Sequence, residues 1–238
     1  MRILDIDGPL IQFLSKMADL MWLNILTMIC CIPIFTAGAS LTALHYMVLK
    51  MVRDEEGYIT RGFFKAFKEN FKQSTIIWCI FLAVGAVLAA DYRIMTNSDV
   101  ALNGVVRMLI LFFIAMTLFT LVYVFPVQAK FSNTVKRTIW NAFVLSVVQF
   151  PKTILMMALY ALPYVMLYLW EGIFPVIFVF CLSLPALLSA KLYNKFFKRL
   201  EDKILEQEAG TEEDRTDEED ERIFKDELDE SLDFGQNN

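Results

Sequence analysis

MLILFFIAMTLFTLVYVFPVQA, residues 108–129, is a run of 22 residues without a charged side chain. A helix that crosses the hydrocarbon core of a bilayer, about 30 Å thick, needs about 20 apolar residues. Four further runs qualify or nearly qualify: residues 20–49, 74–90, 153–170 and 172–190. The sequence therefore predicts an all-α fold, a polytopic transmembrane helix bundle with about five spans.

Composition agrees with a membrane protein and divides the chain into two parts. Of the 238 residues 57% are hydrophobic and 21% are charged, whereas a soluble domain is about half apolar and a quarter charged. Residues 201–238 hold 17 Asp and Glu against 4 Lys and Arg, and residues 1–200 hold 10 against 18. We expect a membrane domain over 1–200 and an acidic cytoplasmic tail over 201–238, disordered or partly helical. This division argues against secreted disulfide scaffolds and against nucleic acid as a partner.

The distribution of Lys and Arg predicts the orientation. Segments 50–73 and 130–152, and the region after residue 190, are rich in bases, and basic loops lie in the cytoplasm. The protein is therefore expected in the bacterial plasma membrane as a multi-pass protein with a cytoplasmic C-terminus. With five spans the N-terminus would lie outside, a placement that Arg2 and Lys16 oppose.

The first run, residues 20–49, is too long for one crossing. Thirty helical residues extend about 45 Å, and Pro33 within the run removes a backbone donor and favours a break. We favour one long broken helix that continues past the interface, with a re-entrant turn as the alternative. The candidate break comprises Pro33, Thr36, Gly38 and Ser40. It is either a binding element with exposed backbone groups or a kink that lets small residues pack closely.

Residues 61–73 predict an amphipathic helix in the inner headgroup layer. One face carries Phe63, Phe64, Phe67 and Phe71, and the other carries Lys65, Lys68, Glu69 and Lys72. We interpret Phe63, Phe64, Lys65, Phe67, Lys68, Phe71 and Lys72 as a candidate face for docking lipid or a cytoplasmic partner. The alternative is a connector packed against the bundle.

A second element of this kind suggests an internal repeat. Trp140, Phe143, Val144 and Val147 have helical spacing and precede Gln-Phe-Pro-Lys-Thr at 149–153, much as the first amphipathic segment contains Asn-Phe-Lys-Gln-Ser-Thr at 70–75. Each unit would comprise a span, an interfacial helix and a second span, so the chain would hold two parallel repeats and a fifth helix.

The run Asn-x-x-x-x-x-Cys-Cys-x-Pro-x-x-Thr-x-Gly-Ala-Ser at 24–40, together with Asn-Phe-Lys-Gln at 70–73, resembles the YesL-like family of bacterial membrane proteins, the domain of unknown function 624. The resemblance implies a multi-pass protein of Gram-positive bacteria, often encoded beside carbohydrate-uptake ABC transporters and sugar-degrading enzymes. The family has no established activity.

Residues that could carry chemistry are few. The sequence lacks the common hydrolase, zinc-protease and Walker motifs, and it holds one histidine, His45. Acidic residues lie near span ends, which argues against a proton- or sodium-coupled carrier. Uncharged polar residues within spans are interpreted as helix-to-helix hydrogen-bonding groups: Asn24, Thr27, Thr117, Thr120 and Ser183. We expect no catalysis, no cofactor and no metal site.

The leading hypothesis is an accessory or regulatory membrane subunit associated with carbohydrate uptake. The alternative is a small-solute carrier or channel that acts on its own. The expected partners are the lipid bilayer and, from the resemblance, ABC-transporter membrane subunits or another protein on the cytoplasmic side.

Overall fold

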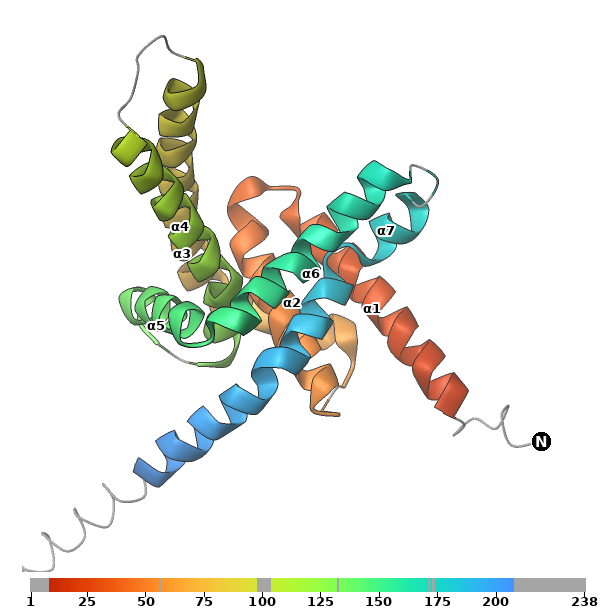
Figure 1. The fold of residues 1–238 in the computed structure, drawn as a ribbon. Helices are drawn as coiled ribbons and strands as arrows, with labels where there is room; N and C mark the ends of the chain where they lie inside the picture. Colours follow the sequence, from red (N-terminus) through yellow and green to blue (C-terminus); the bar gives the residue numbers. More distant parts are fainter. Residues whose placement is uncertain are drawn as a thin grey trace, which may run out of the picture. The chain divides into compact units, whose positions relative to one another are not determined.

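The regular structure is helical throughout the part of the chain that the computed structural model describes, residues 9–55, 57–97, 104–131, 133–170, 172 and 174–207. In chain order the helices are α1 (Pro9–Cys31), the short 3₁₀ helix η1 (Ile34–Thr36), α2 (Ala37–Val52), α3 (Ile59–Asn97), α4 (Gly104–Lys130), α5 (Val135–Val148), α6 (Phe150–Leu169) and α7 (Phe174–Phe180) (Figure 1). Residues 183–192 are also helical. The predicted all-α class is confirmed.

The chain divides into two compact units, Met1–Leu192 and Tyr193–Asn238. In the second unit residues 193–207 are helical, and the rings of Tyr193 and Phe197 lie 4.7 Å apart, one turn along this segment. Most of the predicted acidic tail, residues 208–238, lies outside the described residues.

Four of the described helices are long and apolar enough to cross a membrane: α1, α3, α4 and α6. The chain is thus a multi-pass membrane protein. The runs predicted at 74–90, 108–129 and 153–170 fall on α3, α4 and α6.

The fifth predicted span, 172–190, is not one helix. Helix α7 ends at Phe180, and a turn at Cys181 and Leu182 precedes the helical residues 183–192. Pro185 explains the break, because in a continuous helix its ring would clash with the carbonyl group of Cys181 and it has no N–H to donate there.

Residues 20–49 form a helical hairpin, so the chain reverses direction here and the prediction of one long broken helix is wrong. Helix α1 ends just before Pro33, and α2 runs back along it. The Ser40 hydroxyl donates to the Thr27 carbonyl oxygen at 2.9 Å. At the open end of the hairpin the Lys16 ammonium lies 2.6 Å from the Asp54 carboxylate. The start of α1 and the end of α2 therefore lie together at the open end of the hairpin.

The first amphipathic segment is not a separate helix, which corrects a second prediction. Residues 61–73 are the first part of α3, whose 39 residues extend about 58 Å. The second amphipathic segment is a separate helix, α5, which is followed directly by α6. Pro151 accounts for the difference: it occupies the first turn of α6, where a missing N–H is tolerated, whereas Lys72 stands at the equivalent place in α3.

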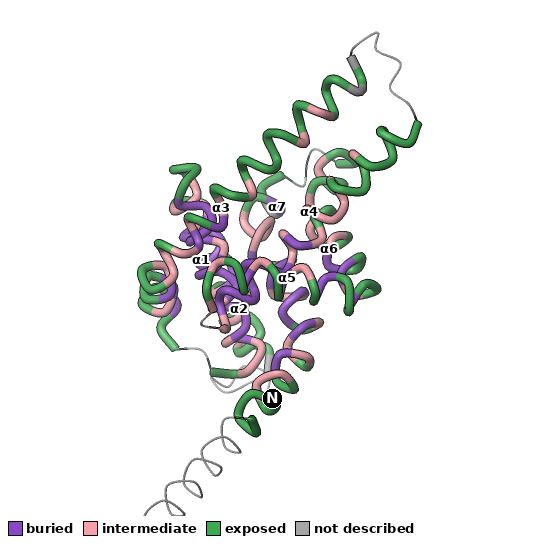
Figure 2. The backbone as a smooth tube through the Cα atoms, turned by 90° about the vertical axis from the view of Figure 1, so that its left-hand side faces the viewer, coloured by how far each residue is buried: buried purple, intermediate pink, exposed green. Residues whose placement is uncertain are grey.

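Burial is concentrated on α2, while the far part of α3 is largely exposed (Figure 2). Helix α2 packs against α1, α3 and α4. Many of the exposed side chains on the far part of α3 are apolar, among them Leu82, Val84 and Val87. An apolar exposed surface on a candidate span is what contact with lipid requires.

Candidate functional site

At the predicted break around Pro33, side chains donate hydrogen bonds to backbone carbonyl groups. The Thr36 hydroxyl donates to the carbonyl oxygens of Cys30 and Pro33, at 2.6 and 2.7 Å. The indole N–H of Trp78 on α3 donates to the carbonyl oxygen of Ile34 at 2.8 Å. Carbonyl groups freed at a break need such donors when no water is near. Sequence analysis included Thr36 and missed Trp78, because nothing in the local pattern pairs the two segments.

Gly38 lets α2 approach α3 closely. A Cβ atom at this position would lie 2.6 Å from the Ser74 carbonyl oxygen and 2.6 Å from Trp78 Cβ. Beside it the Thr42 hydroxyl lies 2.9 Å from the Ser74 hydroxyl and also donates to the Gly38 carbonyl oxygen at 2.9 Å. Small residues combined with hydroxyl contacts are typical of tightly packed membrane helices. The four predicted break residues thus lie together and serve the hairpin and its packing on α3.

Asn24 holds a second break in place. Its side chain is fully buried on α1. The Asn24 Oδ1 atom accepts hydrogen bonds from the backbone N–H groups of Leu182 and Ser183, at 3.0 and 3.2 Å, and Nδ2 donates to the Phe178 carbonyl oxygen at 2.9 Å. The Asn24 amide therefore provides hydrogen-bond partners for backbone groups at the end of α7 and at the start of the next helical segment. The prediction that Asn24 bonds between helices is confirmed.

The Asn-Phe-Lys-Gln segment at 70–73 also joins helices. The Gln128 amide nitrogen on α4 donates to Asn70 Oδ1 at 3.2 Å, and the Thr138 hydroxyl on α5 donates to Gln128 Oε1 at 3.2 Å. The Gln73 amide donates to the Asn133 carbonyl oxygen in the segment between α4 and α5. Sequence analysis quoted this segment for its resemblance but did not predict the network, whose members are far apart in the chain.

A cavity of about 360 Å³ lies between α2, α4 and α6, beside the Pro33 break. Its walls are mainly apolar, and its polar or aromatic members include His45, Trp78, Tyr160 and Tyr164. The Tyr160 hydroxyl lies 3.2 Å from Nε2 of the buried His45. An apolar cavity with a few convergent polar groups is the usual form of a small-molecule site. Sequence analysis placed His45 near the end of the first helix and did not predict a partner for it.

The candidate docking face on α3 is divided between the protein interior and its surface. Phe63 is fully buried, and Phe67 and Phe71 are half-buried. Ring centroids lie 6.3 Å apart for Phe63 and Phe67, and 5.4 Å apart for Phe67 and Phe71. Phe64 is exposed, as are three lysines: Lys65, Lys68 and Lys72. The aromatic rings thus mostly pack inside, and the surface that remains is basic.

The described residues contain no group of three or more His, Cys, Asp or Glu side chains that could hold a metal ion. A hydrogen bond from Lys16 lowers the pKa of the Asp54 carboxyl group, and the positive charge of Lys16 adds to the effect.

Residues 20–92 match the family described as "Protein of unknown function, DUF624", which confirms the resemblance found in the sequence. The curated proteins and the solved structures gave no match. The matched segment contains most of the α1–α2 hairpin and α3 as far as Tyr92. Residues 20–92 therefore form a DUF624 family domain within a multi-pass membrane protein.

Proposed function

We propose that the protein acts without catalysis as an accessory or regulatory subunit associated with carbohydrate uptake. One observation supports the proposal that the protein acts without catalysis. The polar residues that mark the family resemblance, among them Asn24, Thr36, Ser40, Asn70 and Gln73, make hydrogen bonds that hold helices and breaks together. The carbohydrate-uptake context comes from the resemblance to the YesL-like family.

The orientation is part of the proposal. The Lys16–Asp54 contact puts the start of α1 on the side of the basic segment 50–73. Basic segments next to spans lie in the cytoplasm, so we place both there, together with segment 130–152. This replaces the expectation of an external N-terminal end, and it removes the conflict with Lys16. We further propose that α7 and residues 183–192 cross the membrane together as a broken span.

The proposed partner surface is the exposed lysine row of α3: Lys65, Lys68 and Lys72. A membrane subunit of an ABC transporter or another cytoplasmic-side protein would meet these side chains at the inner face. Charge steering favours an acidic surface on that partner.

Quantitative mass spectrometry after purification in mild detergent tests the accessory role. We expect transporter membrane subunits to co-isolate with the native chain and to be lost when Lys65, Lys68 and Lys72 are changed to Glu. A triple variant with the same change of charge at Lys130, Lys152 and Lys191 is the matched control and should retain them. Equal retention by both variants would contradict the lysine row as the partner surface.

The second candidate is a small-solute carrier or channel, and the cavity between α2, α4 and α6 is the observation that favours it. Liposomes that contain only this chain separate the two functions. Flux of a solute through such liposomes, lowered by Tyr160→Phe, would refute the accessory role. Absence of flux over a panel of sugars, with co-isolation of transporter subunits, is the result that we expect.

A further inference from the structure

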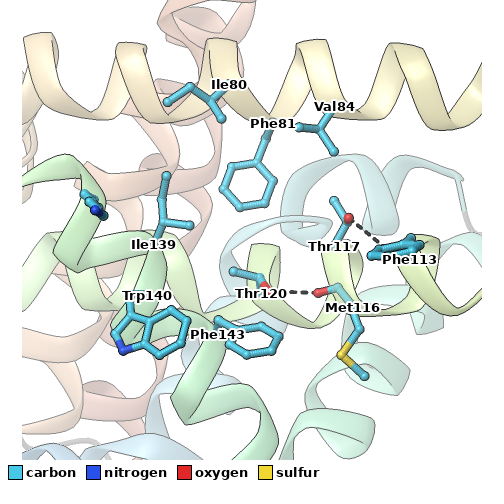
Figure 3. A pocket seen from close by; sticks show the side chains of 11 residues that line it. Ile80, Phe81, Val84, Phe113, Met116, Thr117, Thr120, Ile139, Trp140 and Phe143 are labelled. Carbon is cyan, nitrogen blue, oxygen red and sulfur yellow. Dashed lines mark hydrogen bonds between the residues drawn. The ribbon is translucent and has the colours of Figure 1, made fainter.

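A groove of about 530 Å³ lies between α3, α4 and α5. Figure 3 shows residues that line it: Ile80, Phe81 and Val84 come from α3, Thr117 and Thr120 from α4, and Trp140 from α5. Helices α3 and α4 are both candidate spans. The groove is therefore open to the bilayer, and its natural occupant is a component of the bilayer.

The lining is suited to hydrocarbon. The two threonines in the wall do not offer free donors, because the Thr117 and Thr120 hydroxyls donate to the Phe113 and Met116 carbonyl oxygens of their own helix, both at 2.8 Å (Figure 3). Most other lining residues are aliphatic or aromatic. A polar solute would lose its hydration here without gaining hydrogen bonds in return.

One edge of the groove is suited to an anion. Lys136 is the one charged side chain among the lining residues. It is exposed and lies in the first turn of α5, four residues before Trp140, so that both side chains are on one face of the helix. Trp140 is 64% exposed. Lysine and tryptophan are the residues that mark the boundary between headgroups and hydrocarbon.

We propose that this groove is a binding site for a phospholipid with an anionic headgroup. One acyl chain lies between α3, α4 and α5, and the phosphate group contacts the Lys136 ammonium. The site fits a lipid rather than a free phosphate ion because the charged group borders a long apolar surface. It does not depend on the accessory role proposed above.

A second groove in the same helix pair provides the comparison. It has a volume of about 410 Å³ and is lined by residues of α3 and α4 that include Leu88, Tyr92 and Leu111, with no charged side chain among them. Hydrocarbon can occupy this groove, but nothing in its lining selects a headgroup. Leu88 is four residues after Val84 on α3 and lines only the second groove.

Native mass spectrometry of the purified full-length protein, titrated with phosphatidylglycerol or phosphatidylcholine of identical chains, tests the site. One lysine near a headgroup changes affinity by about 1 kcal/mol, which is about fivefold. We expect phosphatidylglycerol to bind about fivefold more tightly than phosphatidylcholine. The preference should disappear in Lys136→Gln, and it should persist in Lys136→Arg and in the control Lys191→Gln, a change at an exposed lysine that lines neither groove.

Filling the groove tests the position of the acyl chain. Val84→Phe should weaken the binding of both lipids, and the matched variant Leu88→Phe should leave the phosphatidylglycerol preference unchanged. Helix content by circular dichroism and a monodisperse elution profile establish that each variant is folded.

Four results would overturn the proposal. The first is a preference that survives Lys136→Gln, and the second is equal binding by the Val84→Phe and Leu88→Phe variants. The third is suppression of lipid binding by inorganic phosphate alone. The fourth is a stable dimer that Val84→Phe dissociates, because a second copy of the chain would then cover the groove.

Discussion

Replacing Asn24 by Leu tests whether one buried amide holds the break between α7 and the helical residues that follow it. Leucine has the same number and branching of side-chain heavy atoms as asparagine, so the change removes hydrogen bonds without leaving a cavity. The backbone N–H groups of Leu182 and Ser183 and the carbonyl group of Phe178 would then lose the partner that Asn24 provides.

The magnitude follows from these three hydrogen bonds. Side-chain hydrogen bonds in membrane proteins contribute about 0.6 kcal/mol each on average, which gives about 2 kcal/mol for three. Buried backbone groups left without a partner cost about 1–3 kcal/mol each. Because the break can relax in part, we expect Asn24→Leu to lower the free energy of unfolding by about 2–4 kcal/mol.

Equilibrium unfolding in mixed detergent micelles, followed by circular dichroism, measures this difference. Asn141→Leu is the matched control, because Asn141 is exposed on α5 and undergoes the same chemical change. We expect the control to differ from the wild type by less than about 0.5 kcal/mol, as surface substitutions do. If Asn24→Leu were equally neutral, the break would be held by other contacts and the role assigned to Asn24 would be wrong.

Three further predictions concern the hairpin and its surroundings. Gly38→Ala should destabilise the protein by about 1–3 kcal/mol in the equilibrium unfolding assay, because the new Cβ would lie 2.6 Å from a backbone oxygen of α3. Gly85→Ala is the control, since nothing lies within 4 Å of a Cβ at that position, and in the same assay it should be neutral or stabilising by up to about 1 kcal/mol. The lowered pKa of Asp54 means that its pairing with Lys16 stabilises the fold above the unfolded-state pKa and is lost as the pH falls through the folded-state pKa. Asp54→Asn should therefore be less stable than the wild type at neutral pH and indistinguishable from it in acid, and a difference that persists in acid would contradict the charge pairing. His45→Ala should leave co-isolation of transporter subunits intact in correctly inserted protein, whereas its loss would point to a direct role of the His45 and Tyr160 cavity.

Hydropathy predicted most of the helices, because the length of an apolar run is a local property. The runs at 74–90, 108–129 and 153–170 fall on α3, α4 and α6 for this reason. A reversal of the chain was the alternative and not the favoured prediction for residues 20–49, since a reversal and a kink leave the same apolar run. The contacts that distinguish them, Ser40 with Thr27 and Lys16 with Asp54, are separated by 13 and 38 residues.

The positions of the prolines indicate helix breaks that the pattern of apolar residues does not show. Pro151 separates α5 from α6, and Pro185 accounts for the break in the last predicted span. The side chains that satisfy such breaks were harder to predict. Asn24 was recognised as a hydrogen-bonding residue, but its partners at 178–183 lie more than 150 residues away.

The central claim is that α1 and α2 form a hairpin whose open end lies with the basic segments on the inner side of the membrane. Labelling of single cysteines in intact cells by a membrane-impermeant maleimide tests it most directly, in a background where the four native cysteines are replaced. Cysteines substituted for Lys16, Lys65 and Lys136 should react only after the cells are permeabilised, and one substituted for Thr96, at the far end of α3, should react without permeabilisation. Labelling at position 16 from outside would contradict the hairpin, and labelling at 65 or 136 from outside would contradict the membrane arrangement as a whole.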